Sequence, residues 1–444
     1  METPIQFHDL NKLSDTEKHS LLKRTESDLG RYIESVEPIL EAVKEEGDQA
    51  LVRFARKFDQ AELKPDAIKV RSEEFEKAFE SVGEDVIEAI IFAADSIRAF
   101  HRGQLPEPMR MSEIRPGVFC GEKIIPIPSV ACYVPRGKGC FPSVVLMTTI
   151  PAVVAGVPKV CILTPPGADG RVDDATLVAA RQAGIENIYK CGGAQAVAAA
   201  AYGTSTIPKF DKIVGPGSPW VVAAKRLLAD EIDPGTPAGP SESIVFADHT
   251  ADGRLAALDL IIESEHGPDS SAFLVTNSTK VADRALEAIP NYWQSLGETR
   301  RKFSTAVLGG PHGGIVLARD ENSCIDFIND YAPEHLMIHS SEPFKYLGAI
   351  KHAGEILLGQ NTPLSIGNYV LGPNAVLPTS GAARTHSPLG VHDFLKMSGI
   401  GYVTSDAYGQ LAKHAHTLAV YEGFDGHALA VSELRKKLMS KHTR

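Results

Sequence analysis

The stretch KVCILTPPGADGRVDDATLVAARQAGIENIYKCGGAQAVAAAAYG, residues 159–203, decides the fold class of this chain. Short apolar runs at 159–164 and 186–190 predict strands, and each run is followed by a turn. The longer segments at 173–184 and 194–203 are amphipathic or alanine-rich and predict helices. Such alternation is typical of a parallel sheet covered by helices.

The same alternation continues beyond this stretch. A strand is predicted at 211–214 and a helix at 220–231, before the Pro- and Gly-rich link DPGTPAGPSE at 233–242. Beyond the link the apolar runs SIVFAD, SAFLVTN, GIVLARD, HLMIH and EILLGQ predict a second set of strands. Residues 1–105 have mostly helical patterns, and Ser14 with Glu17 has the spacing of a capping box.

We therefore expect an α/β protein with two Rossmann-like parallel-sheet domains and helical N- and C-terminal extensions. The expected N-terminal extension covers residues 1–29, and the C-terminal helical tail covers 389–444. The first α/β domain is expected to be discontinuous, formed by 30–132 and 242–388, with the N-terminal helices joining its strands. The second α/β domain is expected at 133–241.

Composition narrows the possible functions. The 444 residues are 43% hydrophobic and 23% charged, as in soluble globular proteins. No apolar run approaches the roughly 18 residues of a membrane span, and residues 1–20 do not resemble a targeting peptide. We therefore expect a cytoplasmic protein without a membrane partner. A net charge of −11 argues against nucleic acid as a partner, and six cysteines without a C-x-x-C pair argue against a disulfide framework or a cysteine zinc site.

Three glycine-rich turns follow predicted strands, at 134–143, 191–195 and 214–219. Glycine allows a ligand to approach the backbone, and the next helix offers free N–H groups to an anion. In open parallel sheets ligands collect at these carboxyl ends of strands. No turn has the full G-x-G-x-x-G pattern with a later acidic residue, so each is a weak dinucleotide signal by itself.

Glu263 and His266 stand three residues apart where a predicted helix ends at Gly267-Pro268. This spacing places both side chains on one helical face. One interpretation is a helix C-terminus at which a histidine complements the helix dipole. The other is half of a metal or substrate site.

Further titratable pairs occur later in the chain. Glu334 and His335 stand side by side before a predicted strand, where a histidine could serve as a general base, or both could be solvated loop residues. Glu422 and His427 flank glycines that interrupt a helix, and they could be surface residues or part of a site. The long Gly/Pro/Asn-rich segment 365–390 has the character of a functional loop.

Several motifs together resemble the histidinol dehydrogenase family. They occur in one order and cover nearly the whole chain from about residue 30: YVPRGKGCFPSVVLM, GGAQA, DKIVGPG, AAKR, AGPSE, EHGPDS, APEHL, LPTSGAAR, DFLK and EGFDGHA. The resemblance implies a homodimer that uses zinc and NAD. It also implies that a primary alcohol is oxidised to a carboxylic acid in two hydride transfers, through an aldehyde, with L-histidinol to L-histidine in amino-acid biosynthesis as the default reaction.

The resemblance assigns roles residue by residue. His335 corresponds to the general base, and Glu334 to the group that activates the water attacking the aldehyde. The domain 133–241 would bind NAD. Sites would be shared between subunits, with the tail reaching the partner. The positions that correspond to NAD contacts are Tyr133, Gln195 and Ser218. The positions that correspond to metal ligands are Glu263, His266, Asn368 and His427. The substrate positions are Ser241, His335 and Glu422, together with the metal ligands.

Departures from the family pattern concern the metal and the substrate. The family has Gln where Glu263 stands and Asp where Asn368 stands, so an amide and a carboxylate have exchanged places and the formal charge of the metal shell is unchanged. We expect zinc binding to survive, because zinc accepts His nitrogen and carboxylate oxygen alike.

The substrate pocket departs as well. Ala375 stands where the family carries a substrate-contacting His, Arg136 replaces a glycine, and Ser218 replaces an Asn. A lost polar contact can change discrimination by orders of magnitude. One alternative is therefore a paralogue that oxidises another small polar or anionic alcohol, such as a sulfopropanediol, with Arg136 or Lys138 near the anion. Two further alternatives are a non-catalytic metabolite-binding protein and a metal-assisted hydrolase.

Overall fold

Residues 159–203 form the predicted strands and helices, and the two strands belong to a four-stranded parallel sheet, here called sheet B. They comprise β5 (Lys159–Thr164), α7 (Asp174–Ala183), β6 (Ile188–Lys190) and α8 (Gly193–Tyr202). With β4 (Ser129–Tyr133) and β7 (Lys212–Val214) the strand order is β6-β5-β4-β7. Helices cover both faces of sheet B, so even the side chains of alternate residues in β4 are buried.

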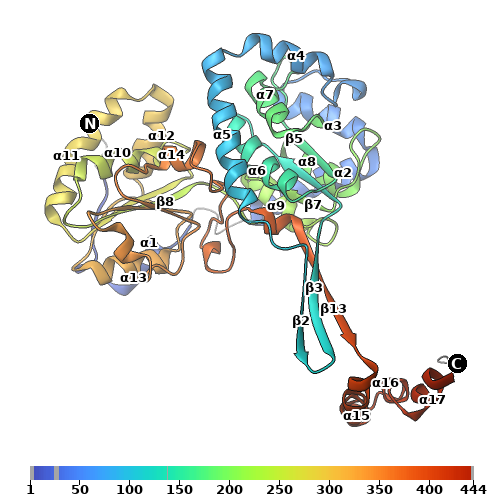
Figure 1. Ribbon diagram of the computed structural model, residues 1–444. Coiled ribbons are helices and arrows are strands. Elements are labelled where there is room, and N and C mark those ends of the chain that lie inside the picture. The colour runs from blue at the N-terminus through green and yellow to red at the C-terminus, as the bar shows by residue number, and fades with distance from the viewer. Residues whose placement is uncertain (1–4, 25–29, 138, 442–444) are drawn as a thin grey trace. The chain divides into compact units, whose positions relative to one another are not determined.

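The computed structural model describes residues 5–24, 30–137 and 139–441, and it divides into two compact units (Figure 1). Unit 1 contains residues 1–105 and 127–394, and unit 2 contains residues 106–126 and 395–444. Lys138, predicted as a possible anion contact, lies outside the described residues.

Sheet A of unit 1 has six parallel strands in the order β1-β10-β9-β8-β11-β12. The apolar runs after the Pro/Gly-rich link provide five of these strands, as predicted, and Phe7–Asp9 adds β1 beside β10. The strands are β8 (Glu242–Ala247), β9 (Ser271–Thr276), β10 (Gly313–Leu317), β11 (His335–His339) and β12 (Glu355–Leu358). The expected α/β class with two parallel sheets is therefore confirmed.

The N-terminal helices pack against sheet B, which corrects the expectation that they join the strands of sheet A. Val36 and Leu40 of α2 (Gly30–Glu46) and Phe54 of α3 (Asp48–Phe54) share a buried core with Ala131 and Cys161 of sheet B. The amphipathic pattern of a helix shows that it packs, but not against which sheet. Two further helices complete this group, α4 (Ser72–Ser81) and α5 (Glu84–Arg102).

The remaining helices of unit 1 follow the sequence pattern closely. Ser14 and Glu17 form the predicted capping box at the start of α1 (Asp15–Leu21). The others are α6 (Pro142–Val154), α9 (Pro219–Leu227), α10 (Gly253–Ser264), α11 (Thr279–Ser295), α12 (Glu298–Leu308), α13 (Glu321–Tyr331) and α14 (Leu364–Tyr369). Within the described ranges, no helix combines the length and hydrophobicity needed to cross a membrane. All six cysteines are free thiols.

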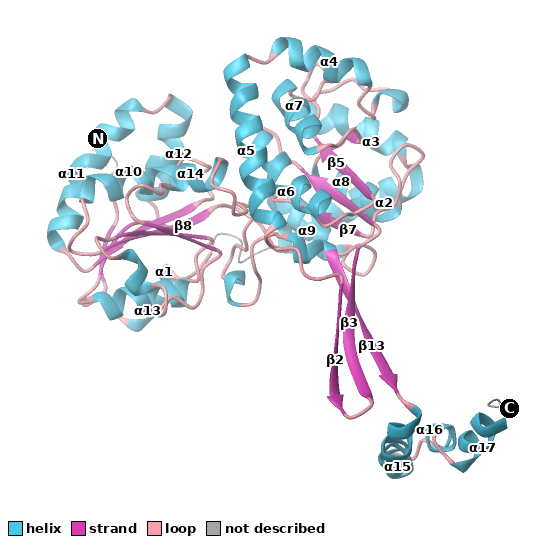
Figure 2. Cartoon of the chain, viewed as in Figure 1, coloured by secondary structure: helices cyan, strands magenta, loops and turns pink. Residues whose placement is uncertain are grey.

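Unit 2 contains an antiparallel sheet and three helices. Figure 2 shows its strands side by side: β2 (Met109–Arg115), β3 (Val118–Pro126) and β13 (Leu395–Val403), in the order β13-β3-β2. Residues 395–403 were expected to be part of a helical tail, and this expectation is wrong because they pair with β3. The tail is helical only from α15 (Ser405–Tyr421) through α16 (Asp425–Ala430) to α17 (Glu433–Lys441).

Candidate active site

A cavity of about 460 Å³ in unit 1 brings together the segments that the sequence singled out. The turns after β4 and β7 line it, so it lies at the carboxyl ends of strands in sheet B. Residues that precede β8, β9 and β11 line it too, so it also lies at the amino ends of strands in sheet A. The predicted site residues in its wall are Ser218, Ser241, Glu263, His266, Glu334, His335 and Asn368.

Three of the four predicted metal ligands lie together in this wall. The amide nitrogen of Asn368 in α14 donates to Oε1 of Glu263 in α10 over 3.0 Å. Nδ1 of His266 donates to the carbonyl of Ile262 over 3.0 Å and lies 3.2 Å from Oε2 of Glu263. Because a carbonyl can only accept, Nδ1 carries the ring hydrogen, and Nε2 is left with a lone pair.

The three residues suit a divalent cation. Oε2 of the fully buried Glu263 and Oδ1 of Asn368 are buried and have no hydrogen-bond partner among the described residues. Buried oxygens without partners are destabilising unless a ligand satisfies them. With Nε2 of His266, they provide the nitrogen and oxygen donors that zinc accepts. Burial would raise the pKa of Glu263, but His266, His335 and Asn368 beside it lower that pKa overall, which favours the carboxylate.

Glu334 directly precedes β11 and His335 is the first residue of that strand, and both line the same cavity. Oε2 of Glu334 accepts from the backbone N–H of Glu242 over 2.8 Å, which fixes the carboxylate. Nδ1 of His335 lies 3.0 Å from Oε2 of Glu355, and Nε2 lies 3.9 Å from Oε1 of Glu334. Both predicted catalytic side chains are buried, so the interpretation of the pair as solvated loop residues is wrong.

The electrostatics of this pair depend on the neighbouring carboxylates. Burial raises the pKa of Glu334 to about 8, and Glu263 adds to the rise. Burial would lower the pKa of His335, but Glu334, Glu263 and Glu355 outweigh burial and raise it. A cation bound at Glu263 would lower the pKa values of Glu334 and His335. This is the direction that a histidine base and a water-activating carboxylate require.

The three residues predicted to contact NAD lie at the carboxyl ends of sheet B. Tyr133 ends β4, and its buried hydroxyl accepts from the backbone N–H of Gly193 over 3.0 Å. Gln195 is buried in the first turn of α8. Ser218 is the N-cap of α9 and, unlike the other two, lines the cavity. Two of the three glycine-rich turns therefore contribute to the cavity wall, and the turn at 191–195 holds Tyr133 instead.

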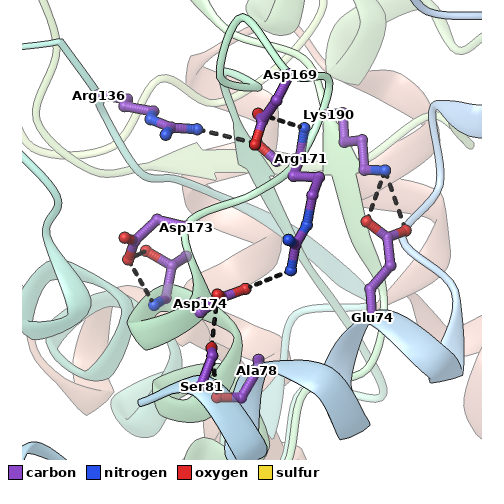
Figure 3. A network of polar contacts seen from close by, with 10 residues as sticks. Glu74, Ala78, Ser81, Arg136, Asp169, Arg171, Asp173, Asp174 and Lys190 are labelled. Carbon is purple, nitrogen blue, oxygen red and sulfur yellow. Dashed lines mark hydrogen bonds and ion pairs between the residues drawn. The ribbon is translucent and has the colours of Figure 1, made fainter. Parts of the chain in front are cut away.

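Arg136, which replaces a glycine of the family pattern, belongs to a polar network at this edge (Figure 3). Its Nη1 donates to the carbonyl of Arg171 over 2.9 Å, and Arg171 donates to Asp174 over 2.9 Å. Asp174 also accepts from the hydroxyl of Ser81 in α4 over 2.6 Å. The network joins the turn after β4 to the turn after β5, and Arg136 still lines the cavity.

The other predicted residues divide between the two units. Ser241 and Ala375 line the cavity, and Ala375 places a methyl group where the family pattern has a polar side chain. Glu422 is the C-cap that follows α15, and His427 lies in α16, both exposed in unit 2. Their predicted roles in substrate and metal binding therefore stay predictions.

Among the residues that the structure describes, a second group of side chains brings possible metal ligands together. Ligand atoms of Asp248, His249 and Glu321 lie within 4.8 Å of one another. The buried Asp248 already accepts four hydrogen bonds, from the amide and hydroxyl of Thr250 and the hydroxyls of Ser340 and Tyr346. These bonds account for Asp248 without an ion, and the group shares no residue with the predicted ligand set.

Two residues with contacts at the site were not predicted from the sequence. Glu355 contacts His335, and the one available signal was a charged residue at the head of the apolar run EILL. Arg300 of α12 lines the cavity and donates to the carbonyl of Glu265 over 3.0 Å. No local pattern distinguishes it from Arg301, the exposed residue that follows.

Known proteins resemble this chain over nearly its whole length. The sequence profile described as Histidinol dehydrogenase matches residues 22–435. A "Histidinol dehydrogenase homolog" of Colwellia psychrerythraea is 58% identical over 435 residues, 98% of each chain. A "Histidinol dehydrogenase" of Synechocystis is 47% identical over 96% of this chain and 98% of its own length. The crystal structure of histidinol dehydrogenase from Elizabethkingia anophelis aligns with a TM-score of 0.90 at 34% identity, covering 98% of both chains. This chain belongs to the histidinol dehydrogenase family.

Proposed function

We propose that this protein is a zinc-dependent, NAD-linked dehydrogenase that oxidises a primary alcohol through an aldehyde to a carboxylate. The observation that carries the proposal is the placement of Glu334 and His335 in one cavity wall with Glu263, His266 and Asn368. A general base and a set of unsatisfied cation donors are the parts that alcohol oxidation requires. The family and the relatives in it support the same chemistry.

When bound, zinc at Glu263, His266 and Asn368 supplies a Lewis acid for the substrate oxygen, and NAD supplies the hydride acceptor. Nε2 of His335 takes the hydroxyl proton of the alcohol while the carbon gives up hydride, leaving the aldehyde. Glu334 then takes a proton from water as that water adds to the aldehyde carbon. A second loss of a proton and a hydride from the hydrate gives the carboxylic acid, and each oxidation consumes one NAD.

Tyr133, Gln195 and Ser218 are proposed to position NAD. Ser218 lines the cavity, while Tyr133 holds the start of α8 through Gly193. The positive ends of the helix dipoles at the starts of α8 and α9 suit the pyrophosphate.

We also propose a homodimer in which Glu422 and His427 of the partner subunit complete each site, with Ser241 at the substrate. Support comes from unit 2, which exposes more apolar surface than a solvated module needs. Tyr421, 89% exposed, directly precedes Glu422. Other exposed apolar residues of the unit include Met109, Ile114, Met397, Tyr402, Leu418, Val420, Phe424 and Leu429.

The second candidate is the same reaction on a small anionic alcohol, such as a sulfonate. Arg136 and Arg300 both line the cavity and could attract an anionic head group. Ala375 removes the polar contact that the family pattern places there, which disfavours histidinol. The curated relatives at 57–59% identity carry the word "homolog", whereas the Synechocystis relative at 47% does not.

The test is NADH formation by zinc-loaded protein over a panel of histidinol, neutral polyols and hydroxyalkyl sulfonates. The proposal expects NADH with at least one compound, loss of activity after chelation, and recovery when zinc is returned. NADH with histidinol alone supports the default substrate, and NADH with sulfonates alone supports the second candidate. Absence of NADH throughout would contradict both.

A further inference from the structure

A carboxylate that the sequence did not single out contacts the proposed general base. Glu355 is the first residue of β12, and it stands directly beside His335 in the parallel register of β11 and β12. Oε2 of Glu355 lies 3.0 Å from Nδ1 of His335. Both side chains are buried, with exposed fractions of 7% and 3%.

The backbone holds the two residues in this register. The N–H of Glu355 donates to the carbonyl of Glu334 over 2.9 Å, and the N–H of Gly354 donates to the carbonyl of Pro333 over 2.9 Å. The strand starts are thus joined immediately before the two side chains meet. A change at Glu355 would therefore act on His335 before it acted on more distant parts of the site.

The Glu355 carboxylate is also enclosed from the α14 side. A Cβ atom at Gly367 would lie 3.2 and 3.3 Å from its two oxygens and 2.9 Å from Cδ1 of Leu357. Only glycine lets α14 approach this closely without a shift. Gly367 directly precedes Asn368, so the Glu355 carboxylate lies next to the segment that carries a proposed metal ligand.

The contact decides which nitrogen of His335 carries the hydrogen. A carboxylate can only accept, so Nδ1 donates, and in the neutral ring that a general base requires Nε2 keeps its lone pair. We propose that Glu355 is a positioning residue that holds His335 in this tautomer, directs Nε2 to the alcohol, and stabilises the imidazolium formed when the proton is taken. This inference rests on the proposed function. The same division of roles operates when an aspartate orients the histidine of a serine protease triad.

The stability of the fold does not by itself explain why the Glu355 carboxylate is buried. Its Oε1 has no hydrogen-bond partner among the described residues. A buried acceptor without a partner is destabilising, and a neutral side chain at this position would remove that cost. A carboxylate kept at this cost beside a proposed base points to a role in the reaction.

The fold provides a matched control at the opposite end of the same strand. His339 ends β11, and its Nε2 lies 2.7 Å from Oδ2 of Asp259 in α10. Both groups are buried, as Glu355 and His335 are, but neither lines the cavity. The Asp259→Asn variant therefore measures how the loss of a buried carboxylate–imidazole contact affects the stability of the fold, while the residues that line the cavity stay unchanged.

The experiment compares Glu355→Gln, Glu355→Ala and Asp259→Asn in the zinc-loaded, full-length protein. We expect both Glu355 variants to lower kcat by about 10²–10⁴-fold, the range seen when a general base or its orienting carboxylate is compromised. KM, NAD binding and zinc content should change by less than about threefold, because those contacts are retained. Asp259→Asn should leave kcat within about threefold even if it lowers the Tm. Wild-type kcat in the Glu355 variants would overturn the inference.

A double-mutant cycle separates an effect through His335 from a loss of folding. In a His335→Asn background, Glu355→Gln should lower kcat by less than about threefold further, because residues that act as one unit are not additive. An undiminished further loss would show that Glu355 acts elsewhere and would overturn the inference.

A ¹⁵N NMR spectrum of histidine-labelled wild-type protein tests the tautomer without any substrate. A His335 ring protonated at Nδ1, and loss of that fixed state in Glu355→Gln, support the inference. A ring protonated only at Nε2 overturns it. If wild-type protein formed no NADH with the whole panel, the proposed function would fail, and the spectrum would still decide whether Glu355 fixes the ring.

Discussion

The amide nitrogen of Asn368 donates to Oε1 of Glu263 over 3.0 Å, so the two residues that depart from the family pattern at the proposed metal site are in direct contact. The family pattern has an amide at the first position and a carboxylate at the second. Exchanging the two groups preserves both the hydrogen bond and the charge of the pair. This contact gives a physical reason for both positions to change together.

Reversing one position alone should therefore weaken metal binding. Glu263→Gln removes the carboxylate from the proposed shell, and we expect zinc affinity to fall at least about tenfold, the loss that even an outer-shell change produces. The double variant Glu263→Gln with Asn368→Asp restores one amide and one carboxylate and should recover most of the affinity. Competition with a chelating dye measures both.

Asn368→Asp alone is the control for charge, because it places two carboxylates in contact and should raise the pKa of the pair. A double variant no better than Glu263→Gln would show that the two positions do not form one site.

His335→Asn should abolish turnover while binding remains. Loss of a general base costs about 10²–10⁴-fold in rate. NAD and zinc affinities should stay within about threefold, because the imidazole is not assigned to either ligand. Stopped-flow NADH absorbance and calorimetric titration separate the two effects. Equal turnover in wild type and variant would show that His335 is not the general base, whereas binding without turnover in either protein would favour the non-catalytic, metabolite-binding alternative.

Arg300 should matter for an anionic substrate and not for a neutral one. Loss of a hydrogen bond to a charged group costs about 1.5–3 kcal/mol. We therefore expect Arg300→Gln to raise KM for sulfonate alcohols about 10- to 100-fold. Arg301→Gln, at the exposed neighbouring position, is the matched control. The second candidate would lose its support if the two variants gave the same KM.

Lys225 should make stability depend on pH through the turn after β7. Its buried Nζ donates to the carbonyl of Gly215 over 2.9 Å, and burial lowers the pKa of Lys225 to about 8. Between pH 8 and the unfolded pKa of about 10.4, the unfolded chain binds more protons than the fold, so the lysine's contribution to stability rises with pH.

The expected rise is about 3 kcal/mol, at 1.36 kcal/mol per pKa unit. It is measured as the free energy of unfolding of wild type minus that of Lys225→Met, from urea titrations across this range. The subtraction removes the buried cysteines, whose raised pKa values act in the opposite direction. A difference that stays constant with pH would show that Lys225 titrates as it does in solution.

The sequence predicts those parts of the fold in which burial leaves a pattern. The strands and helices from β5 to α9 alternate clearly because each is buried on at least one face. The strands β2, β3 and β13 were not predicted, because most of their residues are exposed or half-exposed and no buried stripe marks them. Helical periodicity also failed to assign α2 and α3 to sheet B, since the pattern does not identify the partner surface.

The residues of the candidate site also differ in whether a local sequence pattern marks them. The spacing of Glu263 and His266 was visible locally, whereas Asn368 lies in a different helix and could be assigned only through resemblance to a family. Glu355 was missed because its contact with His335 depends on β12 pairing with β11, which no local pattern determines.

The number of NADH molecules formed per molecule of alcohol consumed by the zinc-loaded protein decides whether the proposed double oxidation takes place. We expect two, because His335 and Glu334 are proposed to serve successive oxidations at one carbon in the same cavity. Alcohol consumed without NADH, or no consumption of any alcohol by protein with a full complement of zinc, would contradict it.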